Sequence, residues 1–219
     1  MSVPGGIDRE KEIFKLEKEN DGAQVSLMRC VSWNVQSIRN KCSEIMEHIL
    51  DHDANVIFLS ETWMESDKND ITALFRTYGY TLLHNRRKGR EKEIGGGVGV
   101  LVKSTMIHKH LKCKFFSSFE VTIVKVKLTN NTRIVLVTIY RLLFIPAATF
   151  LKEFTELLEI LSVMAEDFVL AGDINFYLNS DDNYVELLSE LCTTFESYPT
   201  KRNTSPREHD PLPAKRPCA

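Results

Sequence analysis

Short apolar runs, each closed by polar residues, recur along the chain and predict buried strands. The segment 168–175 closes with Gly172, Asp173 and Asn175, and the segment 55–62 closes with Glu61. Apolar runs of this length bounded by turn residues are typical of strands buried on both faces. Further apolar or alternating segments predict strands at 30–35, 80–84, 98–102, 121–128 and 133–140, of which the last two form a hairpin.

Apolar residues at helical spacing lie between several of these strands. They predict helices over 37–51, 70–78, 150–161 and 183–195. The first of these helices joins the strand at 30–35 to the strand at 55–62. A strand–helix–strand unit with a polar side chain at the end of each strand is how folds of this class gather a functional site.

The two ends of the chain lack these patterns. Residues 1–26 are rich in charge, with Ile13 and Leu16 as the only apolar pair at helical spacing, which predicts a solvated, flexible and partly helical leader. After Ser197 the apolar pattern stops, and the prolines of 201–219 predict a disordered tail. One domain, 27–200, is therefore expected between them, with the C-terminal part of its sandwich missing.

Composition narrows the class of protein. The 219 residues are enough for one good core, and 43% hydrophobic with 26% charged residues is ordinary for a globular protein. Because no apolar run approaches membrane-spanning length and residues 1–21 lack the apolar centre of a signal peptide, we expect an intracellular protein, nuclear or cytoplasmic. The five cysteines are scattered, which excludes a zinc or disulfide framework.

Net charge limits how the chain would hold a nucleic acid. The formal charge is −2, so the protein lacks the broad positive field of a protein that binds DNA mainly by charge. Arg86, Arg87 and Lys88 open a basic loop that is either a solvated loop or a set of contacts to backbone phosphates. The glycines 95–97 match neither a Walker loop nor a dinucleotide fingerprint. His108 and His110 are interpreted as surface residues.

Polar groups at four predicted strand ends are the candidate site. They are Asn34, Glu61, Tyr140 and Asp173, and Asp173 is followed by Asn175. While the chain stays extended, residues at i and i+2 face the same side, so Asp173 and Asn175 are able to face one small ligand such as a metal-bound phosphate. Each residue also has a plainer interpretation, as a turn former or as the exposed end of a strand.

The order of these blocks resembles a known superfamily. The blocks are Trp33-Asn34-Val35, Ser60-Glu61-Thr62, Thr138-Ile139-Tyr140-Arg141 and Gly172-Asp173-Ile174-Asn175. In this order they resemble the endonuclease/exonuclease/phosphatase superfamily, which has the deoxyribonuclease-I-like fold. Glu61-Thr62-Trp63 and the block 95–98 are similar to the endonuclease domains of LINE-type retrotransposons. The likeness covers roughly 28–200.

The resemblance implies an α+β four-layer sandwich, in which two mainly antiparallel sheets pack together between helices. It implies cleavage of a phosphodiester in DNA with Mg²⁺, or Mn²⁺ as the alternative. Glu61 matches the metal ligand, with Asn34 beside it, and Asp173 matches the group that activates or orients the attacking water. Asn175 and Tyr140 match groups that hold the phosphate, and Arg141 is a further candidate phosphate contact.

The sequence also departs from the family pattern. The family's late Asp strand and Ser-Asp-His block are not found after Pro199-Thr200-Lys201, and Glu208-His209-Asp210 carries its His and Asp in the reverse order. We therefore expect a truncated endonuclease of retrotransposon type with impaired activity. The alternatives are a non-catalytic remnant that binds nucleic acid or protein, and a phosphatase or lipid phosphodiesterase. A truncated sandwich exposes strand edges, which predicts self-association.

Overall fold

The computed structural model describes residues 12–18, 26–64, 70–87, 95–128, 131–164 and 167–175, together with 187, 188 and 191. Lys88, the block at 208–210 and the tail 201–219 lie outside the described residues. Most of the helix expected at 183–195 does too, although Leu187, Leu188 and Leu191 are helical. No described helix is long and apolar enough to cross a membrane.

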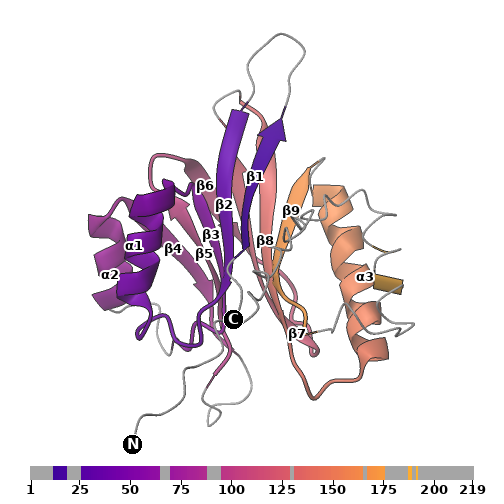
Figure 1. Ribbon diagram of the computed structural model, residues 1–219. Helices are drawn as coiled ribbons and strands as arrows, with labels where there is room; N and C mark the ends of the chain where they lie inside the picture. Colours follow the sequence, from indigo (N-terminus) through magenta and orange to yellow (C-terminus); the bar gives the residue numbers. More distant parts are fainter. Residues whose placement is uncertain are drawn as a thin grey trace, which may run out of the picture.

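The described residues form four layers, with two sheets packed between helices (Figure 1). The first sheet has the order β1 (Glu12–Lys18), β2 (Ser26–Asn34), β3 (Val56–Ser60), β5 (Val98–Lys103) and β4 (Tyr80–Asn85). The second has the order β6 (Ile107–Leu111), β7 (Phe119–Lys127), β8 (Arg133–Arg141) and β9 (Phe168–Asp173). This arrangement confirms the α+β sandwich predicted from the sequence.

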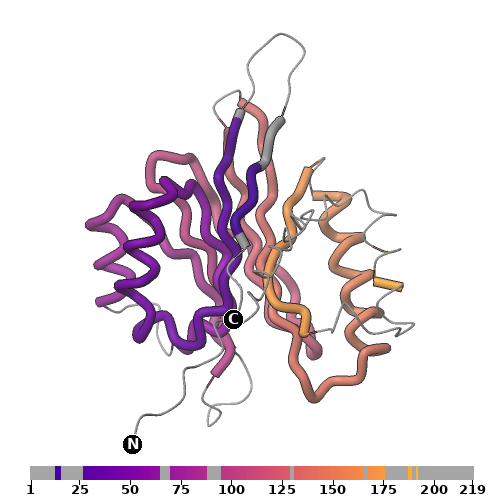
Figure 2. The backbone as a smooth tube through the Cα atoms, viewed as in Figure 1, coloured from indigo at the N-terminus to yellow at the C-terminus, as the bar shows by residue number. Residues whose placement is uncertain are grey.

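Helices cover the outer face of each sheet. Helices α1 (Cys42–His52) and α2 (Asp70–Thr77) pack on the first sheet, and α3 (Ala147–Met164) packs on the second. Figure 2 shows that the chain completes the first sheet before it enters the second. Hydrogen bonds between the two sheets join residues far apart in the sequence, such as Thr122 with Val98 and Thr138 with Gly99.

Successive side chains of a strand point to opposite faces of its sheet, so they contribute in turn to an outer core under the helices and to the core between the sheets. In β3, Ile57 and Leu59 face the helices, whereas Val56 and Phe58 face the second sheet. All five residues of β3 are buried, because both faces of this strand are covered. The uninterrupted apolar run at this position reflects burial on two sides.

Two parallel strand pairs determine where the polar strand ends lie. β2 pairs in parallel with β3, which sets Asn34 opposite Ser60, and β8 pairs in parallel with β9, which sets Tyr140 opposite Asp173. Since parallel strands finish at the same edge of a sheet, each pair delivers two candidate residues to one rim.

The partly helical leader expected at 1–26 is wrong for Glu12–Lys18, which form strand β1. This strand pairs antiparallel with β2, and Phe14 stacks on Phe58 with ring centroids 6.0 Å apart. The edge of β2 offers backbone hydrogen bonds, and Phe14 packs against the core between the sheets. These non-local contacts outweigh the weak helical spacing of Ile13 and Leu16. The remaining division of the chain into leader, domain and tail stays a prediction.

Strand β6 was also not expected. Its residues His108 and His110 were interpreted as surface, but both are half-buried, and the strand pairs antiparallel with β7. A short strand with one covered face and charged neighbours carries little apolar signal. Within the described part of the chain, β1, β4, β6 and β9 are the edge strands. The expected self-association through such edges stays a prediction.

Gly172 precedes the last residue of β9 in a conformation that requires glycine. Its φ is +133°, and an added Cβ would lie 2.0 Å from the Ile139 carbonyl oxygen. We expect Gly172→Ala to lower the free energy of unfolding by about 3 kcal/mol, because backbone strain and overlap add. Urea unfolding measures this loss.

Gly79→Ala is the matched control for Gly172→Ala. Gly79 also has a positive φ, +79°, but no atom lies within 4 Å of an added Cβ. Only the backbone strain remains there, so a loss of about 1 kcal/mol is expected. Equal losses for the two variants would contradict the close approach of β8 at Gly172.

Candidate active site

Four polar side chains meet at the rim where β2, β3, β8 and β9 end. Asn34 is the last residue of β2, Glu61 follows β3, Tyr140 is near the end of β8, and Asp173 closes β9. The first two belong to one sheet and the last two to the other. The structure thus brings together, across the sheet interface, four residues that the sequence places at separate strand ends.

Asn34 joins the two carboxylates of this rim. Its side-chain amide nitrogen donates one hydrogen bond to Glu61 Oε1 at 2.9 Å and another to Asp173 Oδ2 at 2.8 Å. Both amide protons are therefore used, one on each sheet. A neutral donor between two carboxylates lets them approach each other without a buried cation from the protein.

The backbone holds Glu61 in an uncommon conformation. Its φ is +54°, which non-glycine residues rarely adopt, and its side chain is buried. The Glu61 carbonyl accepts a hydrogen bond from the Ser37 amide at 2.8 Å, and the Thr62 amide donates to the Gly97 carbonyl at 3.1 Å. The loops after β2 and before β5 therefore fix this turn. Strain held by surrounding structure is characteristic of functional sites.

The phenol of Tyr140 contacts the same cluster. Its hydroxyl donates a hydrogen bond to Glu61, and burial, followed by the negative charges of Glu61 and Asp173, raises the pKa of Tyr140 to about 12. The phenol is therefore protonated at neutral pH and serves as a donor. The Arg87 guanidinium carbon lies 6.0 Å from the centroid of the Tyr140 ring and covers one face of it.

Asp173 and Asn175 form a tight turn after β9. The Asn175 backbone amide donates to Asp173 Oδ1 at 2.9 Å, and Asn175 has a φ of +50°. This contact orients the Asp173 carboxylate, so that Oδ1 receives the turn and Oδ2 receives Asn34. The Asn175 side-chain amide donates to the Arg141 carbonyl at 2.8 Å.

Arg141 lies beneath this turn. Its guanidinium donates to the Asn175 carbonyl at 3.1 Å and to the Ile145 carbonyl at 3.2 Å, and burial lowers the pKa of Arg141. These contacts tie the segment after β9 to the segment before α3. Arg141 and the Asn175 amide thus support the position of Asp173. The phosphate contacts expected of both residues stay a prediction.

A partly buried ion pair borders the rim, and sequence reasoning missed half of it. Arg87 Nε lies 2.6 Å from Glu120 Oε1, and the Gly97 amide donates to Glu120 Oε2 at 2.6 Å. Burial raises the pKa of Glu120, and Arg87 opposes this shift. Arg86, by contrast, is exposed.

The glycine triplet is the sequence signal for this ion pair. An added Cβ at Gly96 would lie 2.4 Å from the Arg87 guanidinium carbon. Gly96 has a φ of +73°, which favours glycine, and the Arg87 side chain would have to shift to admit a Cβ. A glycine triplet that matches no phosphate-binding motif thus indicates close packing of another side chain.

The donor set of the rim fits a hard divalent cation. Asn34 Oδ1 is buried and has no hydrogen-bond partner among the described residues. With the carboxylates of Glu61 and Asp173 it makes an all-oxygen set, which suits Mg²⁺ because this ion retains several waters. Within the described ranges, no three His, Cys, Asp or Glu residues gather as a metal cluster. A cation at this rim would therefore depend on the Asn34 oxygen and on substrate or water.

Comparison with known families identifies the family of the chain. The sequence model of the endonuclease/exonuclease/phosphatase family matches residues 31–216. The chain belongs to this family. The match starts close to residue 28, as expected, and runs beyond residue 200, where the sequence likeness was expected to stop. None of the curated proteins compared with the chain matches its sequence.

Solved structures of the endonuclease/exonuclease/phosphatase fold are similar to this chain. The endonuclease domain of TRAS1, a telomere-specific non-LTR retrotransposon, has a TM-score of 0.58 at 13% identity and covers 77% of this chain and 72% of its own. The 3′ phosphatase NExo from Neisseria, bound to a product DNA hairpin, has a TM-score of 0.55 at 14% identity. The match covers 76% of this chain and 70% of NExo. ANGEL2, a 2′,3′-cyclic phosphatase, has a TM-score of 0.60 at 17% identity, and the match covers 86% of this chain and 61% of ANGEL2. At these identities the likeness shows the fold alone.

Replacing Asn34 by aspartate tests the amide bridge of this family member. We expect Asn34→Asp to lower the free energy of unfolding by about 3 kcal/mol in EDTA at neutral pH, because two hydrogen bonds are lost and a third carboxylate is added. Urea unfolding measures the loss. Asn55→Asp is the control. It keeps the side-chain oxygen that accepts a hydrogen bond from the Arg29 backbone amide at 2.8 Å, so its free energy of unfolding should change little. Similar losses in both variants would rule out the bridge as a stabilising contact.

The buried phenol of Tyr140 makes a prediction at high pH. Its pKa is about 12 in the folded protein against 10.0 ordinarily. From pH 10 to 12 the unfolded chain loses this proton while the folded chain keeps it, so stability falls as the pH rises through this window. Tyr140→Phe should make the fall less steep, as measured by urea unfolding at several pH values.

Tyr80 also contributes to the loss of stability between about pH 10 and 12, and it is still present in Tyr140→Phe. Burial, followed by the charge of Asp53, raises the pKa of Tyr80 to about 12. Tyr140→Phe should therefore reduce the fall without abolishing it. A fall of unchanged steepness would show that burial and the neighbouring carboxylates do not raise the pKa of Tyr140.

Proposed function

We propose that this chain is a metal-dependent phosphodiesterase that cleaves nucleic acid as an endonuclease, with DNA as substrate and Mg²⁺ as the cation. One observation carries the proposal: a single amide holds Glu61 and Asp173 together at the rim between the sheets, with distances of 2.9 and 2.8 Å. Two carboxylates beside a protonated phenol are suited to hydrolysis of a phosphate ester.

Glu61 and the Asn34 oxygen would hold the cation. A bound Mg²⁺ would supply positive charge next to a phosphate oxygen. The Asn34 amide protons fix the orientation of both carboxylates, so neither has to reorient when substrate binds. The Asn34 oxygen, which has no protein partner in the described part of the chain, is consistent with this role.

Asp173 is suited to accept the proton of the attacking water. It is held through Oδ1 by the Asn175 backbone amide at 2.9 Å and through Oδ2 by Asn34, and each oxygen has a second lone pair. Tyr140 keeps its proton at neutral pH and is suited to donate a hydrogen bond to a phosphate oxygen as negative charge develops there.

Two finer parts of the proposal rest on the sequence. The blocks Glu61-Thr62-Trp63 and 95–98 support a LINE-type retrotransposon origin, and the similarity to the TRAS1 endonuclease domain is consistent with it. The impaired activity expected from the missing Ser-Asp-His block stays a prediction, and so does a non-catalytic binding role.

A phosphatase is the second candidate. Structures of the same fold include the 3′ phosphatase NExo and the 2′,3′-cyclic phosphatase ANGEL2. The same carboxylates and phenol suit a terminal phosphate as well as an internal one, because a fold does not choose its substrate. The activity assay therefore includes both substrates.

Nicking of supercoiled plasmid DNA with Mg²⁺ tests the proposal. We expect Asp173→Ala to lower the rate by a factor of about 100 or more, because a positioned general base typically contributes this much. Asp51→Ala, an exposed carboxylate on α1, is the control and should nick like the parent protein. EDTA should abolish nicking.

Two results would overturn this assignment. Equal nicking by the parent and Asp173→Ala would place the activity outside this rim. The second result is a parent protein that does not nick plasmid but releases phosphate from a 3′-phosphorylated oligonucleotide. If Asp173→Ala loses that phosphate release, the phosphatase would be supported in place of the endonuclease.

A further inference from the structure

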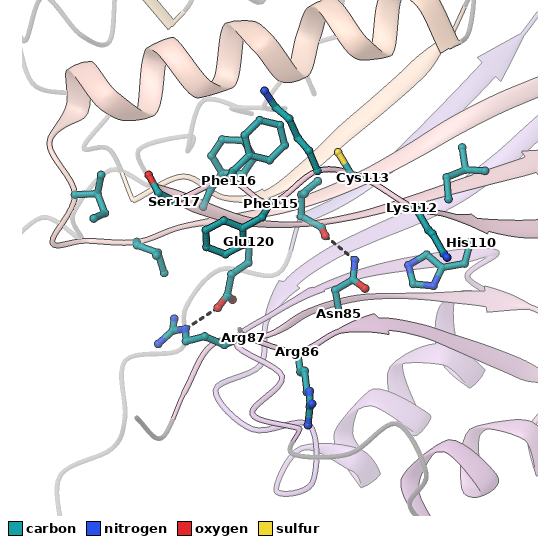
Figure 3. Close-up of a pocket in the computed structure, with 16 residues that line it drawn as sticks. Asn85, Arg86, Arg87, His110, Lys112, Cys113, Phe115, Phe116, Ser117 and Glu120 are labelled. Atoms are coloured by element: carbon teal, nitrogen blue, oxygen red, sulfur yellow. Dashed lines mark hydrogen bonds and ion pairs between the residues drawn. The ribbon is translucent and has the colours of Figure 1, made fainter. Parts of the chain in front are cut away.

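A cavity of about 770 Å³ opens beside the candidate active site, between the two sheets (Figure 3). One wall is the end of β4 and the segment after it, with Asn85, Arg86 and Arg87. The opposite wall is the loop between β6 and β7, from Lys112 to Ser117. This volume falls in the range of sites for small organic ligands and is sufficient for a nucleotide.

The cavity and the active site share a wall. Glu120 and Arg87 line the cavity, and Glu120 lies directly opposite Tyr140 in the β7–β8 pairing. The Arg87 guanidinium carbon lies 6.0 Å from the centroid of the Tyr140 ring. A group bound in the cavity would therefore lie next to a phosphate held at Tyr140.

The lining is locally basic in a chain of net charge −2. Four lysine and arginine side chains line the cavity against one carboxylate, Glu120, which is already paired with Arg87 at 2.6 Å. Lys114 is paired with Glu156, and Arg86 is an exposed residue of this lining. These charges favour an anionic ligand in the cavity.

The loop that forms one wall is held rigidly. Glu153 of α3 accepts hydrogen bonds from the backbone amides of Ser117 and Ser118 at 3.1 and 2.8 Å. The hydroxyls of both serines also donate to it, at 2.8 and 2.6 Å. Phe116 is buried and stacks on Phe119 with centroids 4.5 Å apart. Because the residues that follow it are held in place, the backbone position of Phe115 is fixed from its C-terminal side.

Phe115 itself is unlike its neighbour. Its side chain is 69% exposed although it lines the cavity, while Phe116 is buried in the core below. A rigid loop that presents a large aromatic ring to solvent, among basic side chains, matches the pattern of proteins that stack single nucleobases. In these proteins the ring takes the face of the base and cations take the phosphates.

We propose that this cavity is a subsite for an unpaired nucleobase, stacked on Phe115, that flanks the phosphate held at the Tyr140 rim. The inference rests on the proposed function, because it takes the substrate to be a nucleic acid. A base within an intact duplex is stacked and paired, so only a single-stranded or unpaired nucleotide enters the cavity. The substrate class is therefore nucleic acid with unpaired residues beside the cleaved bond.

Binding without catalysis tests the subsite. Fluorescence anisotropy in EDTA compares a labelled single strand of about 12 nucleotides, the scale of one such binding groove, with a blunt duplex of equal length. We expect Phe115→Ala to weaken single-strand binding by roughly tenfold and to leave duplex binding almost unchanged. Leu50→Ala on α1 is the matched control, because Leu50 is also 69% exposed and does not line the cavity.

A second pair of variants tests the basic wall. Arg86→Gln should make the salt dependence of single-strand binding shallower by about 0.7 in the logarithmic slope, the value for one phosphate contact to a single strand. Arg76→Gln, which changes an exposed arginine on α2, should leave the slope unchanged. Thermal melts show that each variant is folded.

The outcomes separate this inference from the proposed function. Equal single-strand affinity of Phe115→Ala and Leu50→Ala, or equal weakening of single-strand and duplex binding by Phe115→Ala, would overturn the subsite. Because the binding assay contains no metal, an inactive protein that shows the Phe115-dependent preference would overturn the catalytic proposal while supporting the subsite. A protein that nicks DNA but shows no Phe115-dependent preference for single strands would support the catalytic proposal and overturn the subsite.

Discussion

The candidate active site depends on one amide group that spans two sheets. Asn34 donates to a carboxylate on its own sheet and to one on the facing sheet, so the rim exists only while the sheets are packed in register. The apolar core between the sheets, which includes Phe58, Val124, Leu136 and Val169, sets that register. Packing far from the rim thereby decides the distance between Glu61 and Asp173.

That core also offsets the unfavourable features of the rim. Glu61 has a positive φ, and the Arg87–Glu120 pair is largely removed from water, where pairing alone seldom repays desolvation. Strand β3, buried on both faces between helices and the second sheet, carries Glu61 directly at its end. A strained and charged site is thus attached to a strand whose five residues are all buried.

Sequence reasoning succeeded where the determinants are local and failed where they are not. Strands β3 and β8 have short apolar runs bounded by polar residues, which is typical of buried strands, and their polar ends predicted which residues share a rim. β1 and β6 were missed because their stability comes from pairing with β2 and β7. Glu120 escaped notice for a related reason: its partner Arg87 is 33 residues away, and within its own strand it looks like an ordinary outward-facing polar residue.

The use of an amide at position 34 has an electrostatic consequence for the proposed chemistry. One divalent cation would balance the two carboxylates, so a phosphate approaching the rim would meet no net negative charge. A third carboxylate at this position would repel the substrate, whereas a lysine would compete with the cation. Arg87 does not alter this balance, because Glu120 neutralises it at 2.6 Å. In the proposed reaction, the attraction for the substrate's charge would therefore come from the basic lining of the adjoining cavity, and different residues would hold the nucleic acid and cleave it.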